Sequence, residues 1–413
     1  MKKNNSKKER LSYYLFDWAN SPFSTIVITF IISSYFVNKI APDNILGTSL
    51  WGWTIAASSF FIAILGPLLG FVADKRKNFS YYIVLFLTLF IVFLCTMLWF
   101  SKPSINYLWF TLIIIFFANT FFEISQIFYN SFLPQFKKNF PIGEFSGTAW
   151  AYGYIGGIVC LCLILFLLVL PSQNIFGLDE DNYEHIRVTG PIVALWYLLF
   201  SLPFLANCNK FRKHFKTNQN QENFISGITK IFKNKSKFKY LLARMVYTDG
   251  LITLFSFGGI YASTTFGFSF NEIIVFGITI NISAAIGAYV LGIIENRIGS
   301  KQVILISLIF LIVICFFILF IKSKVLFWAL SFFMGFFIGS IQSSSRTTLV
   351  NISNKTELNK MFGLYAFSGK STNFLGPLLV ASLTSAFDSQ RIGMSVILAF
   401  LILGSFLLYK TKV

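Results

Sequence analysis

Two carboxylates in this sequence stand inside long apolar stretches, where they are able to bind a proton or a cation. Asp17 and Asn20 have the spacing that places side chains on one face of a helix, and Asp249 lies well inside a later stretch. Where such stretches cross a membrane, a charged side chain costs roughly 2.5–3.5 kcal/mol and therefore usually faces a cavity or a partner. The alternatives are that Asp17 anchors its helix at the membrane interface, and that Asp249 forms a structural ion pair with Arg244 or Lys370.

A third polar face combines a carboxylate with two amides. Glu123, Gln126 and Asn130 recur at the spacing of one helical face in another apolar stretch. We expect Glu123 to titrate and to couple proton movement, with a cation pair between helices as the alternative interpretation.

Two cations near the end of the chain are candidates for binding an anion. Lys370 and Asn373 share a helical face, and so do Gln342 and Arg346 in the preceding apolar stretch. Lys370 lies too deep to reach the membrane interface easily with its long side chain, so we expect it to bind a substrate carboxylate or an internal acid. Arg346 is expected either to join that anion site or to anchor its helix at the interface.

The composition excludes several classes of protein. Of 413 residues, 55% are hydrophobic and only 12% are charged, whereas soluble domains carry about 25% charged residues. A cytosolic enzyme, a disordered chain and a nucleic-acid-binding protein are therefore excluded as leading interpretations. We expect the formal net charge of +18 to lie in short cytoplasmic loops. We expect these basic loops to contact membrane lipids and not nucleic acid.

The chain offers few of the side chains that metal sites and enzymes use. Its two histidines, His185 and His214, fall in predicted loops, and its five cysteines form no CxxC pair. We therefore expect no metal site and no cofactor. The sequence also lacks a GxxxxGK[ST] loop, which argues against an ATPase. An intramembrane enzyme would need a clustered catalytic set, but the acids lie on separate predicted helices, so we predict no catalytic residues and no enzymatic activity.

The apolar stretches are long enough to cross a bilayer as helices, because a spanning helix needs about 20 mostly apolar residues. Shorter segments of alternating residues, as in a membrane barrel, are not the pattern here. Twelve windows meet the requirement. They are residues 13–37, 50–73, 80–100, 106–133, 147–170, 190–206, 240–265, 271–294, 301–321, 325–350, 361–387 and 392–409.

Positive charge in the loops predicts the orientation. When the chain is threaded with its N-terminus inside, most of its 34 lysines and arginines fall in inside-facing segments. We expect a multi-pass protein of the cell's inner membrane with both termini cytoplasmic. The predicted domains are a six-helix bundle over 1–206, a basic linker over 207–239 and a second bundle over 240–413. We expect the linker to be solvated beside anionic headgroups, with a regulatory docking site as the alternative.

The two predicted bundles repeat parts of one another at a constant offset. Gln126 and Asn130 match Gln342 and Arg346, while a second set of matches consists of glycines. These are Gly147 with Gly363 and Gly153 with Gly369. Repeats of this kind suit two bundles that rock about a central site, as in many secondary transporters.

A glycine followed by an acid and basic residues occurs after the second predicted span and again after the eighth. The first copy contains Gly70, Asp74 and Arg76, and the second contains Gly292, Glu295, Arg297 and Gly299. Both resemble the signature of the major facilitator superfamily, in which the acid holds one conformation closed. We therefore expect the two copies to form a conformational gate. Two positions depart from that signature: Lys77 occupies the place of a glycine, and Asn296 occupies the place of the acid, with Glu295 beside it.

The segment Tyr14-Leu15-Phe16-Asp17-Trp18-Ala19-Asn20-Ser21-Pro22-Phe23 resembles the opening signature of the autophagy-linked vacuolar amino-acid effluxer family and its bacterial relatives. Further similar segments lie around Arg244 to Gly250, Gln342 to Arg346 and Phe362 to Pro377. The resemblance implies an all-α fold of twelve transmembrane helices in two pseudo-symmetric bundles, and efflux of amino acids.

These observations together predict a secondary active transporter that moves a small polar solute by alternating access, coupled to protons. The expected solute and coupling site consists of Asp17, Asn20, Glu123, Gln126, Asn130, Asp249, Gln342, Arg346, Lys370 and Asn373. The alternatives are a membrane receptor or scaffold that does not transport, and an exporter of lipids or drugs.

Overall fold

The computed structural model describes residues 2–76, 78–169, 177–211 and 223–412. Every regular element in these ranges is helical, and no strand occurs among them. Contacts divide the chain into two compact units. The first comprises Met1–Leu65, Lys77–Phe132 and Tyr152–Phe215, and the second comprises Gly66–Arg76, Leu133–Ala151 and Lys216–Val413.

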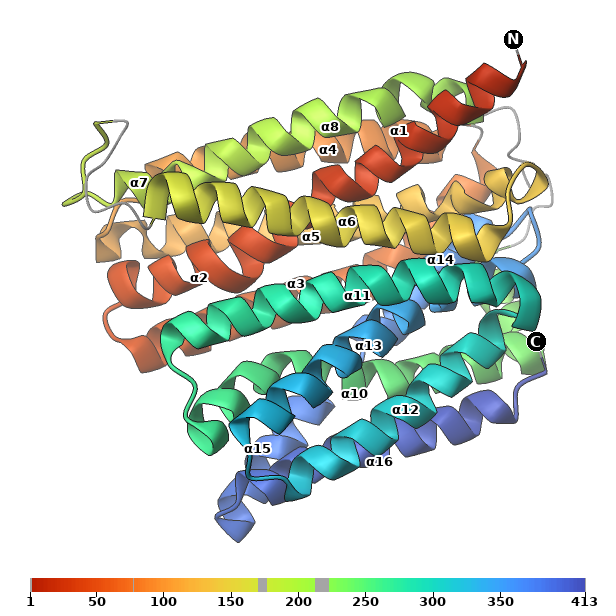
Figure 1. Ribbon diagram of the computed structural model, residues 1–413. Helices are drawn as coiled ribbons and strands as arrows, with labels where there is room; N and C mark the ends of the chain where they lie inside the picture. The colour runs from red at the N-terminus through yellow and green to blue at the C-terminus, as the bar shows by residue number, and fades with distance from the viewer. Residues whose placement is uncertain (1, 77, 170–176, 212–222, 413) are drawn as a thin grey trace. The chain divides into compact units, whose positions relative to one another are not determined.

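The first unit is built from the helices of the N-terminal half (Figure 1). Its helices are α1 (Lys2–Pro22), α2 (Ile31–Tyr35), α3 (Asn44–Lys75), α4 (Phe79–Met97), α5 (Leu108–Ser131), α6 (Ile142–Ile164), α7 (Glu184–Arg187) and α8 (Thr189–Phe211). Shorter π and 3₁₀ segments join or extend them: η1 (Phe23–Phe30), η2 (Phe36–Ile40), η3 (Leu98–Phe100), η4 (Ile105–Tyr107), η5 (Leu133–Lys138) and η6 (Leu165–Val169). In this unit α8 packs against α1 and α4, and α4 packs against α5. The last part of α3, all of η5 and the first part of α6 belong to the second unit.

The second unit contains the remaining helices. They are α9 (Phe224–Lys233), α10 (Lys235–Phe266), α11 (Phe270–Ile298), α12 (Ser300–Phe320), α13 (Lys324–Ile352), α14 (Leu358–Lys370), α15 (Leu375–Phe387) and α16 (Gln390–Tyr409). Helix α13 packs between α11 and α12, while α10 packs against α16 and α14 (Figure 1).

Ten of the described helices are long and apolar enough to cross a membrane. Two of the twelve predicted windows are not among them. The window at 240–265 lies on α10, which is long but contains Arg244 and Asp249. The window at 361–387 was predicted as one continuous span, but the structure divides it into α14 and α15, separated by residues 371–374.

Proline explains both major irregularities, because its ring removes one amide donor and clashes with the carbonyl four residues earlier. Pro377, in the first turn of α15, leaves the carbonyl of Asn373 without an amide donor, and Asn373 lies in the interruption between α14 and α15. Pro22 leaves the carbonyl of Trp18 without its usual amide donor, and the indole Nε1 of Trp196 donates to that carbonyl at 3.2 Å. The chain then continues as a π-helix over Phe23–Phe30.

The predicted linker at 207–239 is partly helical. Arg212, Lys213 and Lys216 lie outside the described residues. The described part contains α9, whose Phe224 ring packs edge-on against Phe71 of α3 with the ring centroids 5.5 Å apart. The predicted domain boundaries stay a prediction, and the contact units differ from them at two segments. Residues 66–76 and 133–151 group with the second unit because they make the close contacts described next.

Candidate functional site

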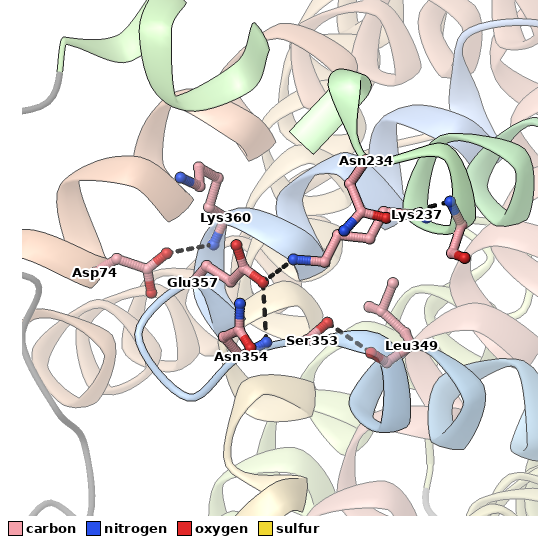
Figure 2. A network of polar contacts seen from close by, with 9 residues as sticks. Asp74, Asn234, Lys237, Leu349, Ser353, Asn354, Glu357 and Lys360 are labelled. Atoms are coloured by element: carbon pink, nitrogen blue, oxygen red, sulfur yellow. Dashed lines mark hydrogen bonds and ion pairs between the residues drawn. The ribbon is translucent and has the colours of Figure 1, made fainter. Parts of the chain in front are cut away.

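Asp74, near the end of α3, accepts hydrogen bonds from the start of α14. Its carboxylate receives the backbone N–H of Asn359 at 3.0 Å, the side-chain amide of Asn359 at 2.9 Å and the backbone N–H of Lys360 at 3.0 Å. Figure 2 shows the contact with Lys360. The first amides of a helix lack partners within the helix and carry partial positive charge, so a buried carboxylate is well placed there. Asp74, 8% exposed, therefore fastens α3 to the first turn of α14.

Glycine permits the close crossing that brings Asp74 to this position. A methyl group on Gly70 would lie 2.4 Å from the carbonyl oxygen of Asn359. On the other helix, a methyl group on Gly363 would lie 2.4 Å from the carbonyl oxygen of Gly66. Neither crossing position has room for a side chain without movement of the backbone.

The same arrangement occurs between α11 and α6. The backbone N–H of Gly143, in the first turn of α6, donates to Oδ1 of Asn296 at 3.2 Å. A methyl group on Gly147 would lie 2.2 Å from the carbonyl oxygen of Ala288 and 3.0 Å from the Cα of Gly292. Asn296 thus makes the contact with a helix start that Asp74 makes in the first copy of the motif. We call these two contacts the Asp74 clamp and the Asn296 clamp.

Glu295 lies beside the Asn296 clamp and has different partners. The hydroxyl of Ser344 donates to Glu295 Oε2 at 2.5 Å. Arg346, two residues further along α13, is 2% exposed. It donates from Nε to Ser146 Oγ at 3.1 Å and from Nη2 to the Ser146 carbonyl at 3.0 Å. Its guanidinium also lies over the ring of Trp150, 5.7 Å from the centroid. Arg346 is therefore engaged with α6 within the described structure.

Three other residues of the predicted gate lie at the surface of the described structure. Arg76 and Arg297 are exposed. Gly299 is exposed as well and ends α11 with φ +90°, a backbone conformation that glycine adopts readily. Its role in the observed structure is to allow the turn into α12.

A further network joins α10 to the start of α14 (Figure 2). Lys237 forms an ion pair with Glu357, whose Oε1 also accepts the backbone N–H of Asn354 at 2.9 Å. The Lys237 and Glu357 side chains are only 8% and 14% exposed. Sequence reasoning missed this pair. Its available signal was an acid placed directly before the apolar run that begins α14.

Among the predicted site residues of the first unit, Asp17 and Asn20 are buried on α1. A methyl group on Gly153 of α6 would lie 3.5 Å from the Asp17 Cβ. The Asn20 Nδ2 has no hydrogen-bond partner among the described residues. Ser24, which follows in the π-helix, is exposed.

The predicted face of α5 is half-buried and lies in the same unit as α1. Glu123, Gln126 and Asn130 are each partly buried, and Gln126 Nε2 has no hydrogen-bond partner among the described residues. Helix α5 is held to α1 by Tyr129, whose hydroxyl donates to the Tyr13 carbonyl at 2.9 Å. The structure therefore places the carboxylates of α1 and α5 on helices that contact one another.

The predicted residues of the second unit gather around α10 and the interrupted helix. Asp249, 2% exposed, has a carboxylate oxygen, Oδ1, that accepts no hydrogen bond from the described residues. A methyl group on Gly376 would lie 1.7 Å from Thr253 Oγ1, so α10 and α15 approach closely beside Asp249. Lys370 is the last residue of α14, and Asn373 lies in the interruption that follows. Gln342 is half-buried on α13.

Comparison with known proteins identifies the family. A family model described as "Vacuole effluxer Atg22 like" matches residues 36–413. The uncharacterized MFS-type transporter YxiO of Bacillus subtilis is 24% identical over 389 residues, which cover 91% of this chain and 88% of that protein. Autophagy-related protein 22 of Kluyveromyces lactis is 22% identical over 324 residues, covering 70% of this chain and 64% of that protein. This chain thus spans less than two thirds of that fungal relative.

Solved structures share the fold at low sequence identity. The proton:xylose symporter XylE superposes with a TM-score of 0.77 at 10% identity, covering 99% of this chain and 96% of that chain. The transporter FucP, in an outward conformation, gives 0.75 at 14% identity and covers 99% of both chains. Both are transporters of the major facilitator superfamily, so the predicted twelve-helix fold is confirmed. The chain belongs to the vacuole effluxer Atg22 like family of integral membrane proteins.

Proposed function

We propose that this protein is a secondary active transporter that moves a small polar solute across a membrane by alternating access. The observation that carries the proposal is the repeated clamp. Segments 66–76 and 133–151 come from the N-terminal half of the sequence, and each is joined to helices of the C-terminal half by the same combination of close glycines and a hydrogen bond to a helix start. We assign the two clamps to the cytoplasmic gate.

The clamps have a strength suited to a gate that opens and closes. Hydrogen bonds to a charged group contribute about 1.5–3 kcal/mol each, and the three at Asp74 add to the close packing of the crossing. Differential binding of a solute shifts an equilibrium of that size. A cluster held by many more such bonds would stay in one conformation.

For the solute, we propose amino acids, with Lys370 as a residue that binds an anionic group. The family description names an effluxer, and Lys370 lies at the interrupted helix, the kind of element that forms solute sites in transporters. We assign proton or cation coupling to Asp249 acting with Glu123 or Asp17. Arg346 is assigned to the gate instead, because its guanidinium is bound to Ser146.

The proposal includes the placement of the chain. We place it in the cell's inner membrane with both termini cytoplasmic, and we assign residues 1–206 and 240–413 to two bundles joined by the linker 207–239. Protease protection of terminal tags in oriented vesicles tests this orientation.

Flux in proteoliposomes tests the function. The purified full-length chain is reconstituted, and uptake and efflux of a labelled amino-acid mixture are measured with and without a pH gradient. We expect gradient-dependent flux that falls at least tenfold in Asp249→Asn and in Lys370→Ala, roughly the effect of losing one specific polar contact. Lys324→Gln, which removes a half-exposed cation, is the matched control and should transport normally.

Two results overturn these assignments. Flux like that of the wild type in both Asp249→Asn and Lys370→Ala shows that the site is elsewhere. Absence of gradient-driven movement of amino acids, sugars, nucleosides and organic anions supports a receptor or scaffold instead, and selective movement of lipids or drugs supports an exporter of apolar compounds.

A further inference from the structure

Arg244 is a buried cation of α10 that sequence reasoning considered only as an ion-pair partner of Asp249. It is 9% exposed. Its guanidinium carbon lies 3.3 Å from the centroid of the Tyr365 ring, on α14, so the two groups are stacked. Nη1 donates hydrogen bonds to the Tyr365 carbonyl and, at 2.7 Å, to the Ser368 hydroxyl. Helix α14 therefore holds the guanidinium plane in a defined orientation.

The positive charge of Arg244 is not matched by an acid within the described structure. The described ion pairs of the second unit, Lys237 with Glu357 and Lys324 with Glu272, do not include Arg244. The nearby tyrosines 240 and 247 direct their hydroxyls to Ser345. A buried charge without a counter-charge is costly, which makes this position a strong candidate for an anionic ligand.

The donors that remain define the chemistry of that ligand. Both protein hydrogen bonds leave from Nη1, whereas Nε has no hydrogen-bond partner among the described residues. Nε shares one edge of the guanidinium with Nη2, and their N–H bonds run parallel, a geometry that matches the two oxygens of a carboxylate. The Nη1 corner is held by α14, and the opposite edge is the one suited to a ligand.

Gly369 supplies the space that this arrangement requires. A methyl group on Gly369 would lie 2.9 Å from Nη1 of Arg244. The glycine therefore lets the guanidinium lie flat against α14, one residue before Lys370 and close to the interruption between α14 and α15.

We propose that Arg244 binds the carboxylate of the transported solute through its Nε–Nη2 edge, which makes the solute class small organic carboxylates, amino acids included. That the bound solute is also transported rests on the proposed function, but the binding step is testable without flux. Ser368 and Tyr365 act as positioning residues that orient the guanidinium.

Ligand-dependent thermal stability of the purified full-length protein tests the binding step. The probes are a mixture of the standard amino acids, a mixture of small organic acids (acetate, lactate, succinate and benzoate), and the matching amides of both. A ligand that binds only the folded protein raises its unfolding temperature. We expect at least one carboxylate mixture to raise the midpoint of the wild type, and the matching amides to leave it unchanged.

Three variants separate recognition from folding. Arg244→Lys keeps the charge but loses the two-pronged edge, and we expect about a tenfold weaker response to carboxylates. Ser368→Ala removes a contact that orients the guanidinium but leaves the Nε–Nη2 edge intact, so we expect its response to carboxylates to lie between those of the wild type and Arg244→Lys. Arg391→Lys is the matched control, because Arg391 also donates to two protein oxygens, the carbonyls of Leu319 and Ile321.

The inference is overturned if no carboxylate mixture stabilises the wild type, if amides stabilise it equally well, or if Arg244→Lys responds as the wild type does. Its failure is distinguishable from failure of the proposed function. Gradient-driven flux of solutes without a carboxylate would keep the transporter and overturn the role of Arg244. Carboxylate binding that depends on Arg244, without any flux, would keep the site and overturn transport.

Discussion

Gly147 of α6 and Gly292 of α11 meet at the point where these two helices cross. A methyl group on Gly147 would lie 3.0 Å from the Cα of Gly292, and one on Gly292 would lie 3.0 Å from the Cα of Gly147. The contact is reciprocal, so either helix must move if either residue gains a side chain. The crossing of α3 and α14 at Gly70 is equally tight.

Alanine at a crossing glycine should prevent the gate from closing. Forcing a methyl group into a packed position costs about 1–3 kcal/mol, so we expect Gly70→Ala to lower the unfolding midpoint and the flux. Gly52, on the same helix, has no atom within 4 Å of the corresponding methyl position. Gly52→Ala should therefore be neutral or stabilising by up to about 1 kcal/mol. Equal behaviour of the two variants would contradict the close-crossing argument.

Asp74→Asn should loosen the first turn of α14. The variant replaces one acceptor oxygen by an amide group that cannot accept, and it removes the charge, so a loss of about 1.5–3 kcal/mol is expected. Hydrogen–deuterium exchange at Asn359 and Lys360 should quicken. Asp43→Asn is the control. The Asp43 carboxylate also accepts a hydrogen bond at the start of a helix, from the backbone N–H of Leu46, but that helix is α3, which directly follows Asp43, and not a second helix. Unchanged exchange at α14 in Asp74→Asn would show that the clamp contributes nothing.

The ion pairs Lys237–Glu357 and Lys324–Glu272, both within the described part of the second unit, should differ in their effect on stability. Breaking the buried pair with Lys237→Gln is expected to cost about 3–5 kcal/mol, because Glu357 is left buried. The side chains of Lys324 and Glu272 are both 37% exposed, and such pairs contribute about 0.2–1 kcal/mol. Chemical unfolding of Lys237→Gln and Lys324→Gln provides the comparison, and a larger loss in Lys324→Gln would refute the prediction.

Arg346 and Ser146 should show coupled effects. Contacting residues in one hydrogen-bond network typically give an interaction energy of about 0.5–3 kcal/mol in a double-mutant cycle. We expect Arg346→Gln combined with Ser146→Ala to destabilise less than the sum of the single variants. Strict additivity in unfolding measurements would mean that the observed hydrogen bonds carry no net free energy.

The family and fold could be predicted because their signals are local and repeated. Long apolar runs separated by basic loops predict spanning helices, and the comparisons confirm the facilitator fold. The family is confirmed by a match that begins at residue 36, after the opening segment that first suggested it. The equivalence of Gly147 and Gly363 was visible as a constant offset, and the structure places both at helix crossings.

The partners of individual polar residues could not be predicted in the same way. Adjacent residues on a helix point in different directions, so the sequence did not reveal which of Glu295 and Asn296 contacts α6. The observed contact to Gly143 is made by Asn296, while Glu295 accepts from Ser344. The stacking of Arg244 on Tyr365 joins helices far apart in the sequence, and no local pattern encodes that pairing.

The two clamps differ in strength, because the amide of Asn296 stands where the first clamp has the carboxylate of Asp74. An ionised oxygen holds amide donors about twice as strongly as a neutral one, and Asp74 receives three such donors, whereas the Asn296 side chain receives one backbone donor, from Gly143. Separation should therefore begin where α6 meets α11 and reach α3 and α14 afterwards. The neutral side chain of Asn296 thus sets the order of opening, in which the Asn296 clamp separates first and the Asp74 clamp second.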